Sequence, residues 1–485
     1  MPDTPPLDLV PILPELILAG MGILILLADA IRPMRDQRIL AALTLVGIVG
    51  AGAFAVWQWV APSSDGLTVL GGMIAVDRYA LFFRLVILAS AAIAVLFSGH
   101  YLTRTGEGRG EYYALLLFAT SGMTLLSAAA DLIVVFLALE ILSLSLYVLA
   151  GFSWRRLASQ EASLKYFLLG AFSSAFFLYG IALAYGATGT TSIGGMARAL
   201  DGGLEGLALP LAAAALLAVG FGFKVAAVPF HMWTPDVYQG APTPVTGFMA
   251  AGTKVAGFAA LIRVSEVALG PLGWELRAGI VAVSALTMVV GSVLAIAQDD
   301  VKRLLAYSSI GHAGFVLVGV AAGNQAGISG AMFYLASYAA MILGAFGVVL
   351  LVSRTGEERT SLQSYRGLAR RSPILGALLM LFLLSLAGIP PLAGFMAKFL
   401  VFEAAIEAGL EGLVIVAVLA SVVAAFFYLR VIVLMYMEDA EEEVAPRSTG
   451  APAWGLAVAA AITVVLGVFP SLLLEPLETA GVLRW

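Results

Sequence analysis

The 485-residue chain contains no cysteine and only three histidines. The missing thiols exclude disulfides, thiolate metal sites, cysteine-ligated iron–sulfur clusters and thiol nucleophiles. The histidines, His100, His231 and His312, are too scattered to match a metal-ligand spacing. Neither a GxGxxG motif nor a Walker loop is present, so the sequence predicts no nucleotide site. If this protein takes part in a redox reaction, the redox centres lie on other chains.

Charged residues are also scarce. They make up 12% of the chain, whereas 61% of the residues are hydrophobic. Soluble proteins carry about 25% charged residues, and a soluble fold of this size could not hide so much apolar surface from water. The net charge of −5 argues against a nucleic-acid partner. The composition therefore predicts an all-α integral membrane protein.

Long apolar runs fill most of the chain. A membrane helix needs roughly 20 mostly apolar residues, which predicts about 14 transmembrane helices within one domain, 1–485. The N-terminus lacks the positive flank of a cleavable signal peptide, so we expect the first helix to be retained. The predicted spans are 7–30, 38–60, 77–100, 112–130, 131–151, 164–187, 206–228, 245–268, 272–297, 302–323, 326–353, 373–400, 408–437 and 452–474.

Lys and Arg are concentrated in alternate loops, which predicts the orientation. The odd-numbered loops carry most of them, whereas residues 60–76 contain none. Because short cytoplasmic loops are enriched in Lys and Arg, the odd loops are predicted to be cytoplasmic and both termini periplasmic. The loop residues that carry this asymmetry are Arg32, Arg35, Arg38, Arg104, Arg109, Arg155, Arg156, Lys302, Arg303, Arg354, Arg359, Arg366, Arg370 and Arg371.

Prolines and glycines interrupt two of the predicted spans. The seventh runs into VPFHMWTPDVYQGAPTPVTGF (228–248), and the twelfth contains SLAGIPPLAGFMAKF (385–399). Proline removes a backbone donor and clashes with the preceding turn, so both helices should be broken. Breaks five helices apart predict two inverted five-helix repeats, helices 4–8 (112–268) and helices 9–13 (272–437). The first three helices (1–111) and a last helix (450–485) flank these repeats.

Four ionisable residues fall inside predicted spans: Glu140, Lys224, Lys254 and Lys398. A charge at the centre of a bilayer costs at least about 2.5–3.5 kcal/mol, so such residues commonly mark ion pathways. A buried lysine with a movable carboxylate partner could hold its proton when paired and release it when unpaired. The alternative is that these charges form fixed ion pairs between helices. Lys224 and Lys398, near helix ends, could also reach the membrane surface.

His312 is a fifth candidate because it lies four residues after Ser308, on the same face of the tenth predicted helix. A histidine can relay protons near neutral pH, although a hydrogen-bonded packing histidine would show the same pattern. We expect His231 to be structural and His100 to be interfacial. Secondary candidates in or beside the spans are Glu15, Asp29, Asp131, Lys165 and Arg430.

Three segments resemble the antiporter-like subunits of respiratory complex I, most closely those of the subunit N type. These segments are 228–248, 385–399 and DDVKRLLAYSSIGHAGF (299–315), and the resemblance covers essentially the whole chain. It implies a 14-helix fold with discontinuous helices seven and twelve. It also implies roles in proton translocation for Glu140, Lys224, Lys254, His312 and Lys398.

The resemblance further implies the surroundings of the chain. The expected partners are lipids and other membrane-arm subunits of complex I, including sibling antiporter-like subunits, in the bacterial inner membrane. The complex would use FMN, iron–sulfur clusters and ubiquinone, with no cofactor in this chain. Two alternatives stay open: a subunit of a Mrp-type cation/proton antiporter or membrane-bound hydrogenase, and a passive membrane scaffold.

Overall fold

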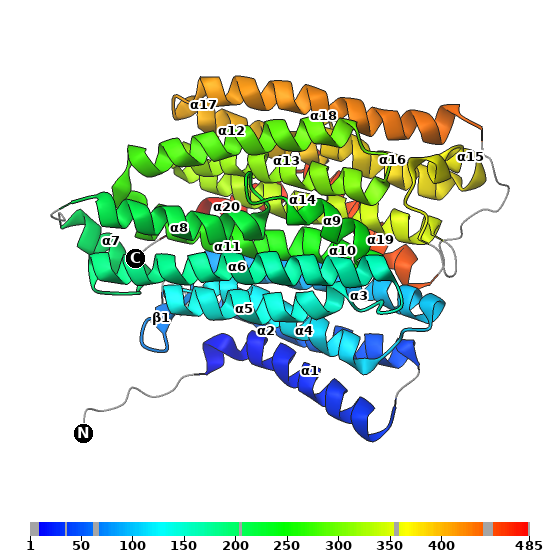
Figure 1. Cartoon of the computed structure of the whole chain (residues 1–485), viewed down its shortest axis with the longest axis horizontal. Helices are drawn as coiled ribbons and strands as arrows, with labels where there is room; N and C mark the ends of the chain where they lie inside the picture. Colours follow the sequence, from blue (N-terminus) through cyan, green and yellow to red (C-terminus); the bar gives the residue numbers. More distant parts are fainter. Residues whose placement is uncertain are drawn as a thin grey trace.

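A computed structural model describes residues 9–33, 36–61, 67–202, 206–353, 358–439 and 450–483. Arg35 and Arg354, which contribute to the charge asymmetry of the loops, lie outside these ranges. The long helices run side by side along one direction and form a bundle (Figure 1).

The helices account for nearly all of the described chain. The long ones are α1 (Leu13–Ile31), α2 (Gln37–Val60), α3 (Arg78–Thr105), α4 (Gly110–Ala128), α5 (Leu132–Ala150), α6 (Leu157–Thr188), α8 (Ala208–Val225), α12 (Trp274–Ile296), α13 (Val301–Ala322), α14 (Gln325–Val352), α16 (Pro373–Ala387), α17 (Ala393–Glu407), α18 (Glu411–Met437) and α19 (Ala451–Val468). The short ones are η1 (Val10–Ile12), α7 (Ile193–Asp201), α9 (Trp233–Gly240), η4 (Gly270–Leu272), η5 (Leu362–Tyr365), α15 (Leu368–Arg371) and α20 (Ser471–Ala480).

One further helix is continuous but irregular. It is made of α10 (Thr243–Phe248), η2 (Met249–Thr253), α11 (Lys254–Arg263) and η3 (Val264–Ala268), and η2 and η3 are π-helical. Such π segments widen the helix locally and are frequent at functional sites. Lys254 is the first residue after the first of them.

The expectation of an all-α membrane protein is confirmed. Within the described ranges, twelve helical segments are long and apolar enough to cross a bilayer, and α16 is a shorter apolar helix. The loop after α2 differs from a plain connection, because β1 (Leu67–Val69) and β2 (Ile74–Val76) form an antiparallel hairpin there.

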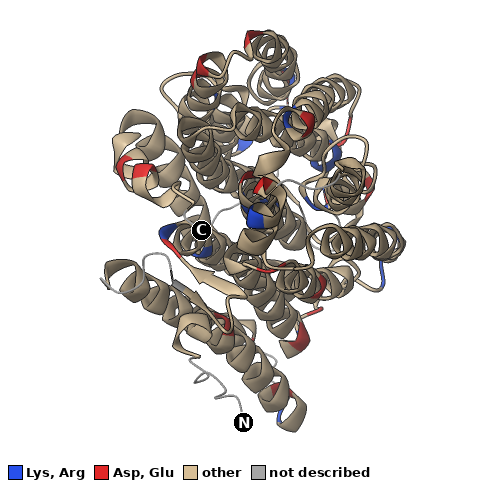
Figure 2. Cartoon of the chain, turned by 90° about the vertical axis from the view of Figure 1, so that its left-hand side faces the viewer, with Lys and Arg blue, Asp and Glu red and all other residues tan. Residues whose placement is uncertain are grey.

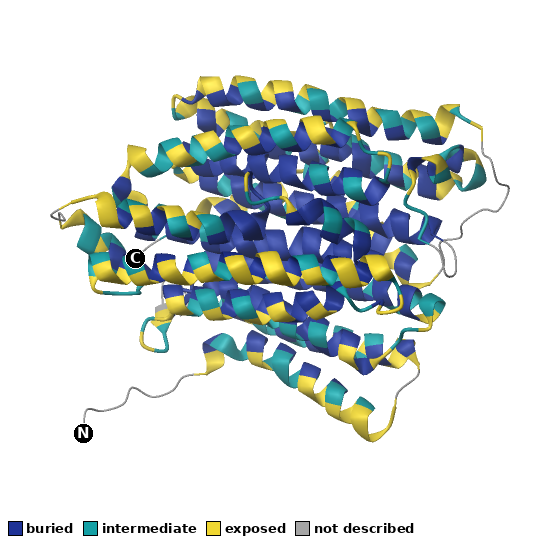
Figure 3. Ribbon diagram, in the orientation of Figure 1, coloured by how far each residue is buried: buried dark blue, intermediate teal, exposed yellow. Residues whose placement is uncertain are grey.

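The bundle has a buried centre and a lipid-facing periphery. The segment 243–268, α13 and α14 are each 94% buried over their most apolar 18 residues, whereas α1, α2, α6 and α12 are 33% buried. Exposed stripes run along the outer helices, and the central ones are almost wholly buried (Figure 3). Charged residues are sparse along the bundle, as Figure 2 shows. Ionisable groups on the central helices are therefore shielded from lipid by other helices.

Both predicted interruptions are present. The helix α8 ends at Val225 because Ala226 adopts a left-handed conformation (φ 62°), and α9 begins only at Trp233. The indole nitrogen of Trp233 donates to the carbonyl of Phe223, 2.9 Å away, which satisfies a backbone group freed by the break. In the other segment, α16 ends at Ala387, Gly388 has φ 89°, and α17 begins at Ala393.

Candidate functional site

Lys224 and Glu140 line one small cavity but do not form an ion pair. The cavity, of about 10 Å³, lies among α5, α6 and α8. The Nζ atom of Lys224 donates to the hydroxyl of Ser143, 2.8 Å away, and Ser143 lies one turn after Glu140 on α5. Ser143 in turn donates to the carbonyl of Leu139. A hydroxyl group therefore holds the buried lysine beside the carboxylate rather than against it.

Glu140 lies at the outer edge of this cavity. Its carboxylate accepts a 2.5 Å hydrogen bond from Ser174 of α6, and its side chain is half-buried. The ammonium of Lys224 is more deeply enclosed and stands 5.7 Å from the ring centre of Tyr166. Glu140 is thus the more accessible member of the two.

Lys254 is buried at the centre of the bundle, and its partners in the described part of the chain are neutral. Its Nζ donates to the backbone carbonyl of Ser309 on α13, and it stands 5.7 Å from the ring centre of Tyr338. The hydroxyl of Tyr338 donates to Ser309 Oγ at 2.8 Å. A backbone carbonyl thus provides the direct polar contact of Lys254.

His312 lies between two tyrosines. Its Nδ1 is 2.7 Å from the hydroxyl of Tyr334 on α14, and its Nε2 is 3.1 Å from the hydroxyl of Tyr428 on α18. The Tyr428 hydroxyl also contacts Ser308 Oγ. Ser308 and His312 therefore share a face of α13, as predicted, and are joined through a tyrosine from a third helix.

Lys398 lies just after the second interruption. Its Nζ donates to the carbonyl of Ala387 at 2.8 Å and to Ser421 Oγ at 2.7 Å. The Ala387 carbonyl is free because α16 ends there, and the negative end of a helix dipole favours a cation. The ammonium also stands 4.7 Å from the ring centre of Phe315.

A single face of α13 connects the central groups. Ser309, His312 and Phe315 follow one another at intervals of three residues, which places them on successive turns. Lys254 binds at Ser309, and Lys398 lies against Phe315. On the other side, the Lys224 stem packs on Gly257, where an added Cβ would lie 3.2 Å from Lys224 Cγ. Gly257 is one turn after Lys254, so the lysines form a continuous series.

Other buried charges are paired, and of the four residues in the first two pairs the sequence singled out Glu15 alone. Arg263 of α11 binds Asp77 with two bonds of 2.7 and 2.9 Å, and Arg84 binds Glu15 at 2.9 Å. Burial pushes the pKa of Asp77 upward, but the Arg263 guanidinium holds it below its usual range. The sequence signal that could have pointed to these pairs was an arginine among apolar residues near the end of a predicted span, as at Arg84 and Arg263.

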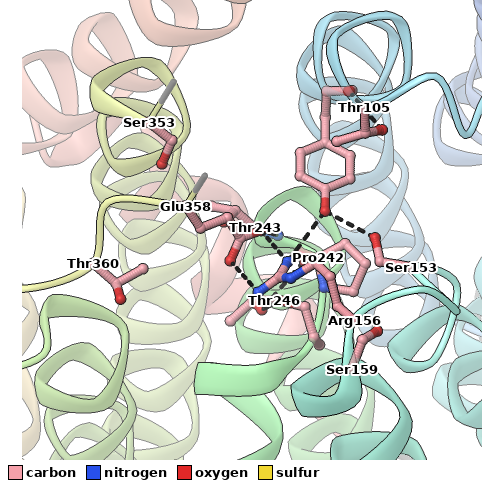
Figure 4. A network of polar contacts seen from close by, with 12 residues as sticks. Thr105, Ser153, Arg156, Ser159, Pro242, Thr243, Thr246, Ser353, Glu358 and Thr360 are labelled. Carbon is pink, nitrogen blue, oxygen red and sulfur yellow. Dashed lines mark hydrogen bonds and ion pairs between the residues drawn. The ribbon is translucent and has the colours of Figure 1, made fainter. Parts of the chain in front are cut away.

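A third paired cluster lies at the end of the bundle predicted to be cytoplasmic. Glu358 binds Lys302 at 3.0 Å and Arg156 at 2.9 Å, and it accepts from the Thr243 backbone at 3.4 Å. Figure 4 shows Glu358 meeting Arg156 and Thr243 between helices. Burial opposes the charge of Glu358, but Lys302 and Arg156 keep its pKa below the ordinary value.

A polar pocket of about 270 Å³ adjoins this cluster and is lined by Glu358, Arg156 and Asp236. Asp236 of α9 pairs with Lys165 at 2.7 Å and with Arg303 at 2.6 Å. Lys165 also lines this pocket. The secondary candidate Arg430 likewise pairs near a helix end, with Asp299 at 2.8 Å.

Two of the three histidines lie outside the central series. His100 is half-buried near the end of α3, and His231 lies in the connection between α8 and α9. Within the described residues, no group of three or more His, Cys, Asp or Glu side chains could hold a metal ion. The buried lysine, glutamate and histidine side chains can bind and release protons.

Comparison with known proteins identifies the family. A sequence profile described as "NADH:quinone oxidoreductase/Mrp antiporter, TM" matches residues 129–425. NADH-quinone oxidoreductase subunit N of Trichlorobacter lovleyi is 47% identical over 471 residues, which are 96% of this chain and 95% of that protein. The subunit N of Rhodococcus opacus is 53% identical over 385 residues, 78% of this chain and 71% of that protein.

Solved structures agree with the sequence relatives. A chain of respiratory complex I from Thermus thermophilus with bound aureothin is 39% identical, with a TM-score of 0.81 over 95% of this chain and 98% of that one. A chain of the Mrp complex from Dietzia, 24% identical, shares the fold with a TM-score of 0.85 over 98% of this chain and 97% of that one. The chain belongs to the NADH-quinone oxidoreductase subunit N family of antiporter-like membrane subunits.

Proposed function

We propose that this subunit moves protons within the membrane arm of an NADH–quinone oxidoreductase, through Glu140, Lys224, Lys254, His312 and Lys398. The observation that carries the proposal is the chemistry around the three lysines. Within the described part of the chain, no carboxylate oxygen lies within 4.0 Å of Lys224, Lys254 or Lys398. Their polar contacts are hydroxyls and backbone carbonyls.

Neutral partners suit a group that must change its charge. A buried ammonium is expensive in a low-dielectric interior, and a neutral oxygen offsets less of that cost than a carboxylate does. An approaching charge can therefore shift the balance between the ammonium and the neutral amine. Hydroxyl and carbonyl oxygens can serve the lysine while it is charged, and hydroxyls can also donate to the amine once it is neutral.

The proposed route follows the contacts. Glu140 is the accessible acid beside Lys224, and their shared cavity is close to the smallest volume that accepts a water molecule. Lys224 packs one turn from Lys254, which binds Ser309 of α13. His312 and its two tyrosines occupy the next turn, and Lys398 lies beyond Phe315. NADH, flavin, iron–sulfur clusters and quinone would act on other subunits.

The same proposal includes fourteen membrane crossings arranged as two inverted repeats. A repeated polar motif supports it. Asp131 caps the N-terminus of α5 and forms an isolated antiparallel β-bridge with Ser192. Its carboxylate accepts a 2.7 Å hydrogen bond from the hydroxyl of Thr191. In the same way, Asp300 caps the N-terminus of α13 and forms an isolated antiparallel β-bridge with Ser361. Its carboxylate accepts a hydrogen bond from the hydroxyl of Thr360.

The second copy of each position lies the same number of residues after the first: Asp300 after Asp131, Thr360 after Thr191, and Ser361 after Ser192. The copies lie at opposite ends of the bundle, next to α7 and near α15 (Figure 1). An inverted relation between the repeats would place them in this way. We further propose that the end carrying α15 is cytoplasmic and that both termini are periplasmic.

The deciding experiment uses Glu140→Gln and Lys224→Ala in native membranes, with assembled complex and proton-coupled quinone reductase activity measured on the same sample. We expect full assembly with reduced activity. Glu161→Gln is the matched control, because Glu161 is an exposed carboxylate whose ion pair is with Lys165, and it should leave activity unchanged. Loss of the assembled subunit would favour the scaffold, and unchanged activity would contradict the proton route.

Two further measurements test the setting. The chain should co-migrate with an NADH-oxidising complex in native gels, and migration with Mrp-type antiporter subunits alone would overturn the assignment.

A fluorescent reporter that matures only in the cytoplasm, fused after Trp485, should stay dark. Bright fluorescence would invert the proposed orientation.

A further inference from the structure

A deep apolar groove lies on the outside of the bundle between α8 and α12. Its volume is about 270 Å³. The walls include small, exposed residues, Ala215 and Ala218 on α8 and Gly279 on α12, which leave the helices apart. The floor is formed by Leu261 and Val264 of the irregular helix. Along α8 the groove ends at Gly222, two residues before Lys224, but none of the five residues of the proposed proton route lines it.

The length of the groove matches one leaflet of a membrane. It follows α8 from Leu211 to Gly222, which at 1.5 Å per residue corresponds to about 16 Å. The hydrocarbon core of a bilayer is about 30 Å thick, so a single leaflet contributes about 15 Å. The chemistry of the lining and this length fit an acyl chain lying against α8.

A polar pocket continues the groove at the end where α12 begins. It also has a volume of about 270 Å³, and it shares Ser265, Leu276 and Ile280 with the groove. Arg277 and Glu266 line this pocket. Trp274 lies beside them and is 62% exposed, which is typical of an aromatic side chain at the level of lipid headgroups.

The charges of this polar pocket are arranged for a zwitterion. Arg277 Nε donates to the Ala321 carbonyl at 2.7 Å, which fixes the guanidinium at the pocket wall. Among the described residues, Arg277 and Glu266 form no ion pair within 4.0 Å. Glu275 adds a second carboxylate at the edge of the groove. One guanidinium suits a phosphate, and two carboxylates suit an ammonium group.

We propose that the groove and the polar pocket together bind one zwitterionic phospholipid with a primary amine, of the phosphatidylethanolamine class. One acyl chain lies between α8 and α12, the phosphate contacts Arg277, and the ammonium group contacts Glu266. An anionic phospholipid would leave both carboxylates without a cation. A choline headgroup has no N–H to donate to them.

The experiment uses the purified complex in nanodiscs that contain phospholipids with a photoreactive diazirine in one acyl chain. After irradiation, the attachment sites are mapped by mass spectrometry. We expect attachment to residues 211–222 of α8 and 276–283 of α12, at least threefold stronger with ethanolamine than with choline or glycerol headgroups. Equal labelling by all three headgroups would overturn the headgroup assignment.

Two substitutions on α8 separate groove occupancy from general lipid contact. Ala218→Leu fills the groove and should remove most of the labelling. Ala212→Leu is the matched control, because Ala212 is exposed on the same helix outside the groove, and it should leave labelling unchanged. Arg277→Gln should abolish the ethanolamine preference while acyl-chain labelling persists. Absence of labelling in the wild-type complex would mean that a neighbouring subunit covers the groove, and would overturn the proposal.

Discussion

The buried charges of this subunit fall into two groups that differ in their partners. Arg263, Arg84 and Lys302 each lie within 3.0 Å of a carboxylate oxygen. Lys224 and Lys254 are also buried, but their polar partners among the described residues are hydroxyl or carbonyl oxygens. The paired cations lie toward the ends of the bundle, whereas the lysines without carboxylates lie near its middle. A carboxylate partner keeps a cation charged, whereas neutral partners allow a lysine to gain and lose its proton.

This difference has a physical basis. In a low-dielectric interior, an ion pair is strongly attractive once both charges have lost their water, so removing one partner is very costly. When a lysine is held by neutral oxygens, its removal leaves no buried charge without a counter-ion. Substitution of the paired residues should therefore affect stability, and substitution of the lysines should affect function.

The largest effect is expected from Arg263→Leu. The substitution leaves the half-buried Asp77 without its counter-ion, and loss of one partner of a buried pair costs about 3–5 kcal/mol. Assembled subunit, measured on native gels, should fall to a small fraction of the wild-type amount. Arg32→Gln, at an exposed position, is the control and should assemble normally. Normal assembly of Arg263→Leu would remove the distinction between the two groups.

Lys254→Met should show the opposite pattern, with normal assembly and reduced activity. It removes a charge that no described carboxylate balances, and it retains most of the side-chain volume, so assembly should stay near the wild-type level. Proton-coupled quinone reductase activity should fall by about tenfold, corresponding to roughly 1.4 kcal/mol in the rate-limiting barrier. Proton uptake into inverted membrane vesicles measures this directly. Lost assembly together with lost activity would place Lys254 with the structural charges.

Glu358→Gln tests the ion-pair cluster beside the polar pocket that Glu358, Arg156 and Asp236 line. Glutamine keeps an acceptor for Thr243 but loses the ion pairs, so the midpoint of thermal unfolding should fall by a few degrees at pH 7. Because the folded-state pKa of Glu358 lies below its unfolded value, its contribution is present above an ordinary glutamate pKa of about 4.3. The difference between variant and wild type should shrink as the pH falls below that value. A difference independent of pH would exclude ionised Glu358 as its cause.

The smallest effect is expected at His312, because its polar contacts are two tyrosine hydroxyls rather than charged groups. His312→Ala should slow proton pumping about threefold and leave assembly intact. Tyr334→Phe removes one of its two hydrogen bonds and should have a weaker effect in the same direction. Normal pumping in His312→Ala would assign the histidine to packing.

Much of the fold was predictable because a bilayer imposes simple rules. Apolar runs of about 20 residues predicted membrane helices, and the proline-rich segments at 228–248 and 385–399 predicted the two interruptions. The hairpin at 67–76 and the π-helical segments around Lys254 were not predicted. Hairpins of three-residue strands have little sequence signal, and a π segment depends on how neighbouring helices pack.

The sequence by itself determined the class of protein, its family and the presence of ionisable residues within apolar spans, because these follow from composition and local pattern. Only the tertiary structure decided which charges are paired. Arg84 of α3 meets Glu15 of α1, whereas Lys254 meets a backbone carbonyl of α13. Partners of this kind come from helices far apart in the chain. Their contacts depend on helix rotation and depth, which a linear pattern does not encode.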